Sequence, residues 1–147
     1  MPALLEVDLD SLAYNMTLLL VAFVLPMLTA WDREAEARSA GLRTFPLVSM
    51  AACAFTLLAM QIFSEGGAEA RILSGVITGI GFIGGGAILK SDSSVSGVST
   101  AAAIWSTGAV GMAVGLGRIE IAIALSLLTF ATFRVFRKAK KKVNDDD

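Results

Sequence analysis

Long apolar runs separated by short clusters of charged residues constrain this chain more than any other feature. A helix needs about 20 apolar residues to cross a bilayer, and five runs approach that length. Only 17% of the residues are charged, and the mean hydropathy is +0.71. We therefore predict an all-α membrane protein, a bundle of about five transmembrane helices, with spans at residues 11–31, 45–63, 72–89, 98–116 and 119–136.

The distribution of basic residues predicts the orientation of these spans. With five spans, ten of the twelve Lys and Arg residues fall on one side and two on the other. Basic segments remain in the cytoplasm, so the N-terminus is predicted outside and the C-terminus in the cytoplasm. The last span is needed for this balance, although Glu120 and Arg134 must extend toward the two surfaces.

The two ends of the chain are expected to differ in role. Residues 1–10 contain three acidic residues and no Lys or Arg, whereas a signal peptide begins with a basic segment. The first apolar run is therefore expected to remain as a span, with a kink or packed break at Pro26. We predict a transmembrane domain over residues 1–137 and a short charged cytoplasmic tail over residues 138–147.

The composition argues against several soluble functions. The chain has no His, and Cys53 lies alone in an apolar run, which excludes His-based metal sites and His acid–base catalysis. We expect no enzyme activity. The net charge is −1, and the basic run Lys140–Lys142 has no interleaved aromatic residues, so no nucleic-acid partner is expected. Membrane lipid is the expected contact of that run.

Glycines concentrate in the third and fourth expected spans. Residues 79–84 match G-x-G-x-x-G, but dinucleotide binding needs a preceding strand and a soluble βαβ unit. Glycines four residues apart instead allow transmembrane helices to approach closely. We assign helix packing to Gly75, Gly79, Gly81, Gly84, Gly85, Gly86, Gly111 and Gly115. The alternative is a broken helix that lines a site, because three consecutive glycines make a weak helix.

The first loop carries the acidic residues closest to a possible metal site. Asp32 and Glu36 are four residues apart and share a helix face. Carboxylate oxygens suit a hydrated Mg²⁺, so Mg²⁺ is a candidate ligand, and no other cofactor is expected. The alternative is a solvated helix face. Gly41 is expected to end this short helix, and Thr44 to cap the second span.

Several motifs, in order, resemble a known family. They are Asp32-Arg33-Glu34 with Ala40-Gly41-Leu42-Arg43-Thr44, the glycine-rich segment 74–86, and segments 97–105 and 113–117. They are similar to the MgtC/SapB family of bacterial membrane proteins over roughly residues 18–133. The resemblance implies a multi-pass protein of the bacterial inner membrane that supports growth or survival when Mg²⁺ is limiting. One mechanism proposed for the family restrains the proton-driven ATP synthase.

The resemblance also implies a cytoplasmic patch of functional residues. The patch comprises Asp32, Arg33, Glu34, Gly41, Arg43 and Thr44. We predict that Asp32 pairs with Arg43 and ties the end of the first span to the start of the second. The pair is either a topological clamp or an ion-sensitive or partner-facing patch. Asp32 stands where the family usually has Glu, and many members also carry a soluble C-terminal domain.

Two functions remain open from the sequence. The first is a regulatory or accessory membrane protein in adaptation to low magnesium, acting through contacts with a membrane-protein partner or as a homo-oligomer. Its support is the glycine-rich spans. The second is an oligomeric transporter or channel for Mg²⁺ or another ion, which needs polar groups inside the membrane. The candidates for that role are Asn15, Thr17, Thr78, Ser106 and Thr107.

Overall fold

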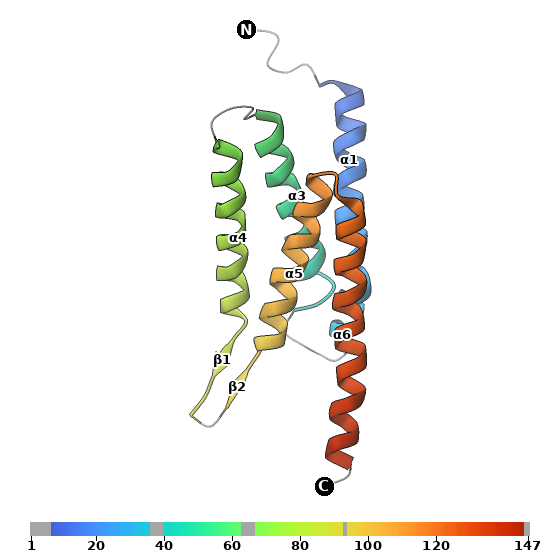
Figure 1. Cartoon of the computed structure of the whole chain (residues 1–147), viewed down its shortest axis with the longest axis vertical. Helices are drawn as coiled ribbons and strands as arrows, with labels where there is room; N and C mark the ends of the chain where they lie inside the picture. The colour runs from blue at the N-terminus through green and yellow to red at the C-terminus, as the bar shows by residue number, and fades with distance from the viewer. Residues whose placement is uncertain (1–6, 36–39, 63–66, 93, 146–147) are drawn as a thin grey trace.

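The protein is a bundle of long helices with one small hairpin. The computed structural model describes residues 7–35, 40–62, 67–92 and 94–145, with side chains described to residue 136. The elements are α1 (Leu9–Val24), α2 (Met27–Glu34), α3 (Thr44–Ile62), α4 (Ala68–Gly86), β1 (Leu89–Lys90), β2 (Val95–Ser96), α5 (Val98–Gly115) and α6 (Ile119–Asp145). The helices run along one common axis, with α1 beginning at one end and α6 finishing at the other (Figure 1). The predicted all-α class is confirmed.

In the described part of the chain, four helical segments are long and apolar enough to cross a membrane. They are Leu9–Glu34, Thr44–Ile62, Val98–Gly115 and Ile119–Phe136, and they match four of the five expected spans. The remaining expected span corresponds to α4, which is 19 residues long, as α3 is. It packs along α3 and α5 (Figure 1). Its first turn contains Glu69 and Arg71, and these charges, with its glycines, dilute its apolar content.

The first span is interrupted at the expected proline. Helix α1 ends at Val24 and α2 begins at Met27, with Pro26 between them. Proline has no N–H to donate and disturbs the preceding turn. The carbonyl of Leu25, next to the proline, accepts a hydrogen bond from the buried hydroxyl of Ser126 on α6. The predicted break is therefore held by a side chain from the last helix.

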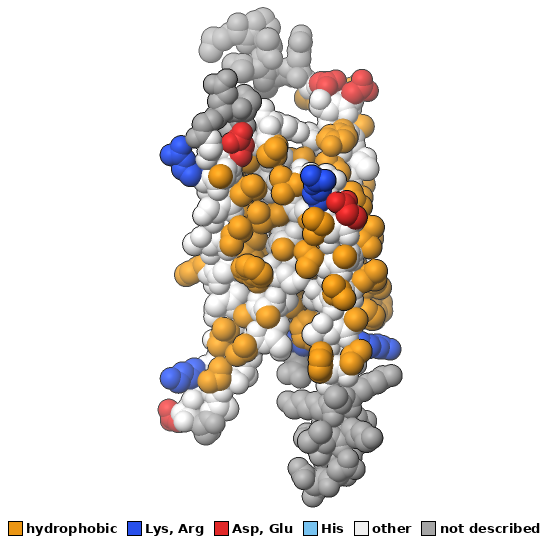
Figure 2. Space-filling view, viewed as in Figure 1, with side chains coloured by type: hydrophobic (Ala, Val, Ile, Leu, Met, Phe, Trp, Pro, Cys, Tyr) orange, Lys and Arg blue, Asp and Glu red, His pale blue; other side chains and the backbone are white. Residues whose placement is uncertain are grey.

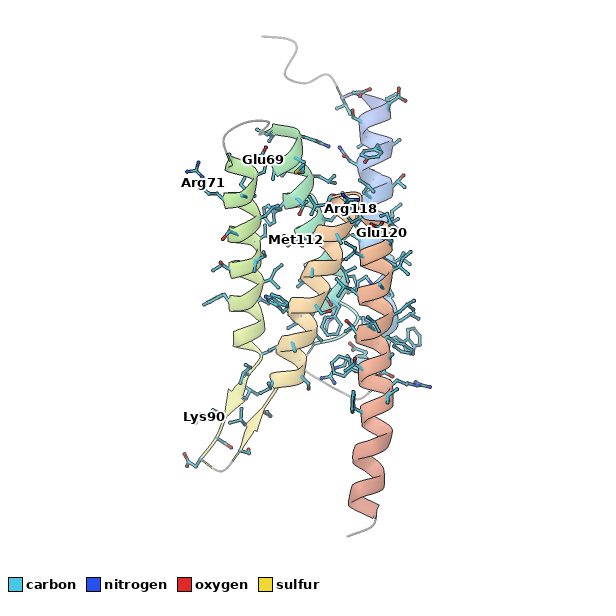
Figure 3. The ribbon with its side chains drawn as sticks, in the orientation of Figure 1. Glu69, Arg71, Lys90, Met112, Arg118 and Glu120 are labelled. Carbon is cyan, nitrogen blue, oxygen red and sulfur yellow. The ribbon has the colours of Figure 1, made fainter. Side chains whose placement is uncertain are left out.

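Helix α5 lies at the centre of the bundle. Half of its span is buried, against 17% of the first span and 11% of the α6 span. Small residues permit this position: a Cβ at Gly108 would overlap the side chain of Ile80 on α4, and one at Gly111 would overlap the backbone of Ser49 on α3. The more peripheral helices present a band of hydrophobic side chains outward, with charges toward its two ends and the pair Arg118 and Glu120 within it (Figure 2, Figure 3).

A short hairpin replaces the end of the third expected span. Helix α4 stops at Gly86 rather than at residue 89, and the next two N–H groups bond only three residues back. Strands β1 and β2 then pair antiparallel, with Leu89 opposite Ser96. Gly97 has φ +84°, and a Cβ there would overlap the Ala87 carbonyl. Glycine therefore allows the chain to turn directly into α5.

The two ends of the bundle differ in what they hold. We call the end at β1 and β2, which includes Lys90, the hairpin end; Glu69 and Arg71 lie at the opposite end (Figure 3). The orientation of these ends in a membrane stays a prediction. The helical backbone of α6 continues into the predicted tail as far as Asp145, and the division into domain and tail stays a prediction.

Candidate functional site

Two adjacent residues of opposite charge are buried in α2 near the hairpin end. Only 6% of Asp32 and 4% of Arg33 is exposed. Both belong to helix α2, so this start of the expected first loop is helical. Burial of a charge is costly unless other groups compensate it, so the contacts of these two side chains define the candidate site.

Arg33 connects three helices. Its Nη2 donates a hydrogen bond of 2.7 Å to Oγ1 of Thr100, which is buried in the first turn of α5. Its guanidinium carbon lies 4.6 Å from the centre of the Phe133 ring on α6, which is within the range of a cation–π interaction. The planar guanidinium can donate and stack at the same time, which the ammonium of lysine cannot do equally well.

Asp32 connects α2 to α6 through an ion pair. Its Oδ1 lies 3.3 Å from Nη1 of Arg134. The Asp32 side chain is 5% exposed and the Arg134 side chain 59%, so the carboxylate lies inside and the guanidinium at the surface. The prediction that Arg43 is the partner is wrong: among the described residues the cation at Asp32 is Arg134. Arg43 is exposed just before α3.

These contacts fasten the end of the first span to the last span. Two neighbouring residues of α2, Asp32 and Arg33, contact two neighbouring residues of α6, Arg134 and Phe133. Thr100 adds the start of α5. Of the two interpretations of the patch, this geometry favours a clamp between helices.

The Mg²⁺ hypothesis is only partly addressed by the structure. Glu36 lies outside the described residues. Within the described part of the chain, no three His, Cys, Asp or Glu side chains form a group that could hold a metal ion. One oxygen of Asp32 accepts a hydrogen bond from Arg134, and a guanidinium at that distance repels a divalent cation. Mg²⁺ binding by Asp32 and Glu36 therefore stays a prediction.

The rest of the predicted patch lies where α2 ends and α3 begins. Glu34 Oε2 accepts a hydrogen bond of 3.1 Å from the Leu42 N–H. A Cβ at Gly41 would overlap the Glu34 side chain, so glycine permits this close passage of the loop. Thr44 is itself the first residue of α3, rather than the residue that precedes the helix.

The eight glycines assigned to helix packing fall into two groups. Three lie inside the bundle: a Cβ at Gly84 would come within 3.1 Å of the Ala101 oxygen, one at Gly115 within 2.7 Å of Thr56 Cβ, and one at Gly111 would overlap Ser49. For the others there is nothing within 4 Å of the Cβ position. These open glycines are Gly75, Gly79, Gly81, Gly85 and Gly86. They do not pack against the described residues of this chain, and their packing against another chain stays a prediction.

An apolar groove lies beside some of the open glycines. It has a volume of about 380 Å³ and lies between α3 and α4. Gly75 and Gly79 line it together with large apolar residues such as Phe55 and Ile83. Phe82, on the same helix, is 85% exposed. Helix α4 stands at the edge of the bundle (Figure 3), so we call this surface the α4 groove.

Sequence reasoning finds the α2 charges but not their partners. Thr100 lies in the motif segment 97–105, and its hydroxyl in a first helical turn is the only local signal for it. Arg134 is recognisable as a charge at the end of an apolar run. Nothing in the local sequence shows that Phe133 and Arg134 contact α2.

Comparisons with known proteins agree with the resemblance. The chain is 33% identical over 126 residues to "Protein MgtC" of Salmonella typhimurium LT2, covering 86% of this chain and 54% of that protein. It is 34% identical to "Protein MgtC" of Brucella abortus, covering 86% and 52%. It is 36% identical over 114 residues to "Putative magnesium transporter YhiD" of Escherichia coli K12, covering 73% and 53%. No solved structure gives a significant match.

The chain spans about half the length of these curated relatives. That half of each relative aligns with 73–86% of this chain, and so with most of the helical bundle. The family model described as "MgtC family" matches residues 19–142, from within α1 to the last turn of α6. The apolar helices of this chain are long enough to cross a membrane, and the chain belongs to the MgtC family.

Proposed function

We propose that this protein regulates adaptation to low magnesium in the bacterial inner membrane by binding a partner transmembrane helix along the α4 groove. It acts without enzyme activity of its own. The observation that carries this proposal is the open glycine surface of α4 beside an apolar groove. The link to magnesium comes from the family and from the names of the relatives.

Lipid provides no hydrophobic driving force between transmembrane helices. Transmembrane helices associate by close packing, and small residues allow their backbones to approach. Gly75 and Gly79 are four residues apart, line the groove and have open space above them. An adjoining hydroxyl, Thr78, is exposed and bonded only to the Ser74 carbonyl of its own helix. A partner helix would gain contact with both the glycine surface and the apolar groove wall.

The test compares two leucine substitutions in the same helix. Gly79→Leu fills the groove, whereas Gly81→Leu places the same side chain in open space outside the groove lining. In a strain that lacks this protein, we expect wild type and Gly81→Leu to restore growth at low Mg²⁺ and Gly79→Leu to fail. Membrane levels of the three proteins are measured by immunoblotting. Equal growth with both leucine variants would contradict the proposal.

Mg²⁺ transport is the second candidate function. It is favoured by the name of the relative, "Putative magnesium transporter YhiD", and by a carboxylate, Asp32, near the end of a span. Mg²⁺ flux into liposomes containing the purified protein separates the two. Flux that depends on the protein and is lost in Asp32→Asn would support transport and contradict the regulatory proposal; absence of flux from a folded, inserted protein would argue against transport.

A further inference from the structure

A second cleft lies on a different part of the bundle, between α2 and α6. Its volume is about 280 Å³, and it is lined by Met27, Leu28, Trp31, Asp32, Phe130 and Arg134. None of these residues lines the α4 groove. The cleft borders the Asp32–Arg134 ion pair, but nothing in the clamp described above uses the space itself.

The lining changes from apolar to charged along the cleft. On α2, Met27 and Leu28 lie about one turn before Trp31 and Asp32, and one turn is about 5.4 Å. On α6, Phe130 likewise lies one turn before Arg134. Because both helices run toward the hairpin end (Figure 1), the apolar part lies nearer the middle of the bundle. The charged part lies nearer the hairpin end.

The charged part offers a cation outward and keeps its anion inward. Arg134 has a 59% exposed side chain, while Asp32 behind it is 5% exposed. A guanidinium has five N–H donors, and in the described structure one of its nitrogens, Nη1, contacts Asp32. An incoming oxyanion therefore meets the guanidinium first and is separated from the carboxylate. The ion pair also holds Arg134 beside the cleft.

The sequence of α6 adds further positive charge at this level. Helix α6 continues past Arg134 to Asp145, and Arg137 and Lys138 follow three and four residues later. Residues at these spacings occupy the same side of a helix. The sequence therefore continues with basic residues about one helical turn beyond Arg134.

The cleft lies at the level along the helices where the membrane surface is expected. Trp31 is 68% exposed and lies near the end of the first apolar span, and Trp side chains favour the membrane–water interface. On α6, Arg134 is the first charged residue after the uncharged run 121–133. The cleft therefore joins the headgroup level to the upper acyl-chain level.

The geometry points to a binding site for an anionic phospholipid in this cleft. Its phosphate contacts Arg134, its headgroup lies beside Trp31, and one acyl chain covers Leu28, Met27 and Phe130. Basic pockets between transmembrane helices bind anionic headgroups in this way. The apolar part of the cleft distinguishes a lipid from free phosphate, which would use only the guanidinium.

Quenching of Trp31 fluorescence tests the site directly. The protein carries Trp105→Phe, which leaves Trp31 as the one tryptophan, and is placed in vesicles with either phosphatidylglycerol or phosphatidylcholine brominated in the upper acyl chains. We expect Trp31 to prefer the anionic lipid by about five-fold, the effect of one basic residue at a membrane surface. In Arg134→Gln, the ratio of quenching by the anionic lipid to quenching by the zwitterionic lipid is expected to fall to about one.

The controls separate this site from general charge effects. Lys90→Gln removes the same charge at the same end of the bundle (Figure 3) and is expected to leave the Trp31 preference unchanged. Trp105, studied alone with Trp31→Phe, should show no preference. Inorganic phosphate at millimolar concentration should not reduce the Trp31 preference, because it lacks the acyl contacts. Competition by phosphate would show that the site binds free phosphate and not a lipid.

Other outcomes would overturn the inference. They are equal quenching by the two lipids at Trp31, a preference that survives in Arg134→Gln, or an equal loss in Lys90→Gln. If Arg134→Gln does not insert, native mass spectrometry of wild type decides: washed protein should retain phosphatidylglycerol over phosphatidylcholine. Retention of neither lipid, or of both equally, would contradict the site.

Discussion

Asp32 and Arg134 are 102 residues apart in the chain, yet their side chains meet at 3.3 Å between α2 and α6. The carboxylate is nearly inaccessible, whereas the guanidinium is more than half exposed. The two partners therefore differ in what their removal leaves behind. Because the first and last spans meet here, the pair helps to close the bundle.

The first prediction follows from this asymmetry. Arg134→Gln leaves a buried carboxylate without its arginine and is expected to destabilise the protein by about 1–2 kcal/mol, a value kept low by solvent at the exposed guanidinium. Asp32→Asn removes the buried charge itself and should cost less, below about 1 kcal/mol. Denaturant unfolding in detergent measures both. A larger loss in Asp32→Asn than in Arg134→Gln would show that the asymmetry is wrong.

The second prediction concerns the shape of the Arg33 side chain. Arg33→Lys keeps the charge but loses the planar group that lies over Phe133 and donates to Thr100. We expect a loss of about 1–2 kcal/mol, measured by the same unfolding assay. The matched control is Arg71→Lys, at an exposed position in the first turn of α4, which should change stability by less than about 0.5 kcal/mol. An equal loss of stability in Arg33→Lys and Arg71→Lys would contradict a role for the planar guanidinium.

The third prediction separates the two groups of glycines. Gly111→Ala places a methyl group against the Ser49 backbone, which cannot move aside as a flexible side chain can. Overpacking of this kind costs about 1–3 kcal/mol. Gly81→Ala adds the same methyl group in open space and gains up to about 1 kcal/mol of helix propensity. The thermal midpoint should fall in the first variant and hold or rise in the second; the reverse order would contradict the packing of α5.

The fourth prediction is a pH dependence at the start of α1. Asp8 accepts hydrogen bonds from the Ser11 hydroxyl and from the N–H groups of Ser11 and Asp10, and the Ser11 hydroxyl in particular lowers the pKa of Asp8. A carboxyl whose pKa is lower in the folded state stabilises the helix above its unfolded pKa. This contribution is lost as the pH falls through the lowered value.

Hydrogen exchange of the first-turn amides measures this effect. Asp8→Ala should exchange faster than wild type at neutral pH, because α1 loses its N-cap. The difference should shrink as the pH falls through the lowered pKa of Asp8. A difference that stays constant with pH would show that ionised Asp8 is not the cap.

The fifth prediction concerns orientation. Asp92→Cys places a thiol on the exposed turn of the hairpin, and Arg71→Cys places one at the opposite end. With the basic end in the cytoplasm, a membrane-impermeant maleimide should label Arg71→Cys on intact cells and Asp92→Cys only after the membrane is opened. Wild type controls for Cys53, which is buried. The opposite pattern would reverse the proposed topology.

The sequence alone determined the helical class, because long uncharged runs in a chain with few charges can satisfy their backbone in lipid only as helices. The break at Pro26 was also local, since proline removes an N–H wherever the chain goes. The early end of α4 was not predicted, because the hairpin depends on pairing between Leu89 and Ser96 across a turn.

Only the tertiary structure decided which residues meet. The family resemblance suggested Arg43 as the partner of Asp32, but α6 packs against α2 at this carboxylate, so Arg134 supplies the charge. The same holds for the glycines: Gly81 and Gly111 look alike in sequence, yet one is open and the other is packed against Ser49. Periodicity shows which residues share a face of one helix, whereas the packing of all the helices together determines what that face contacts.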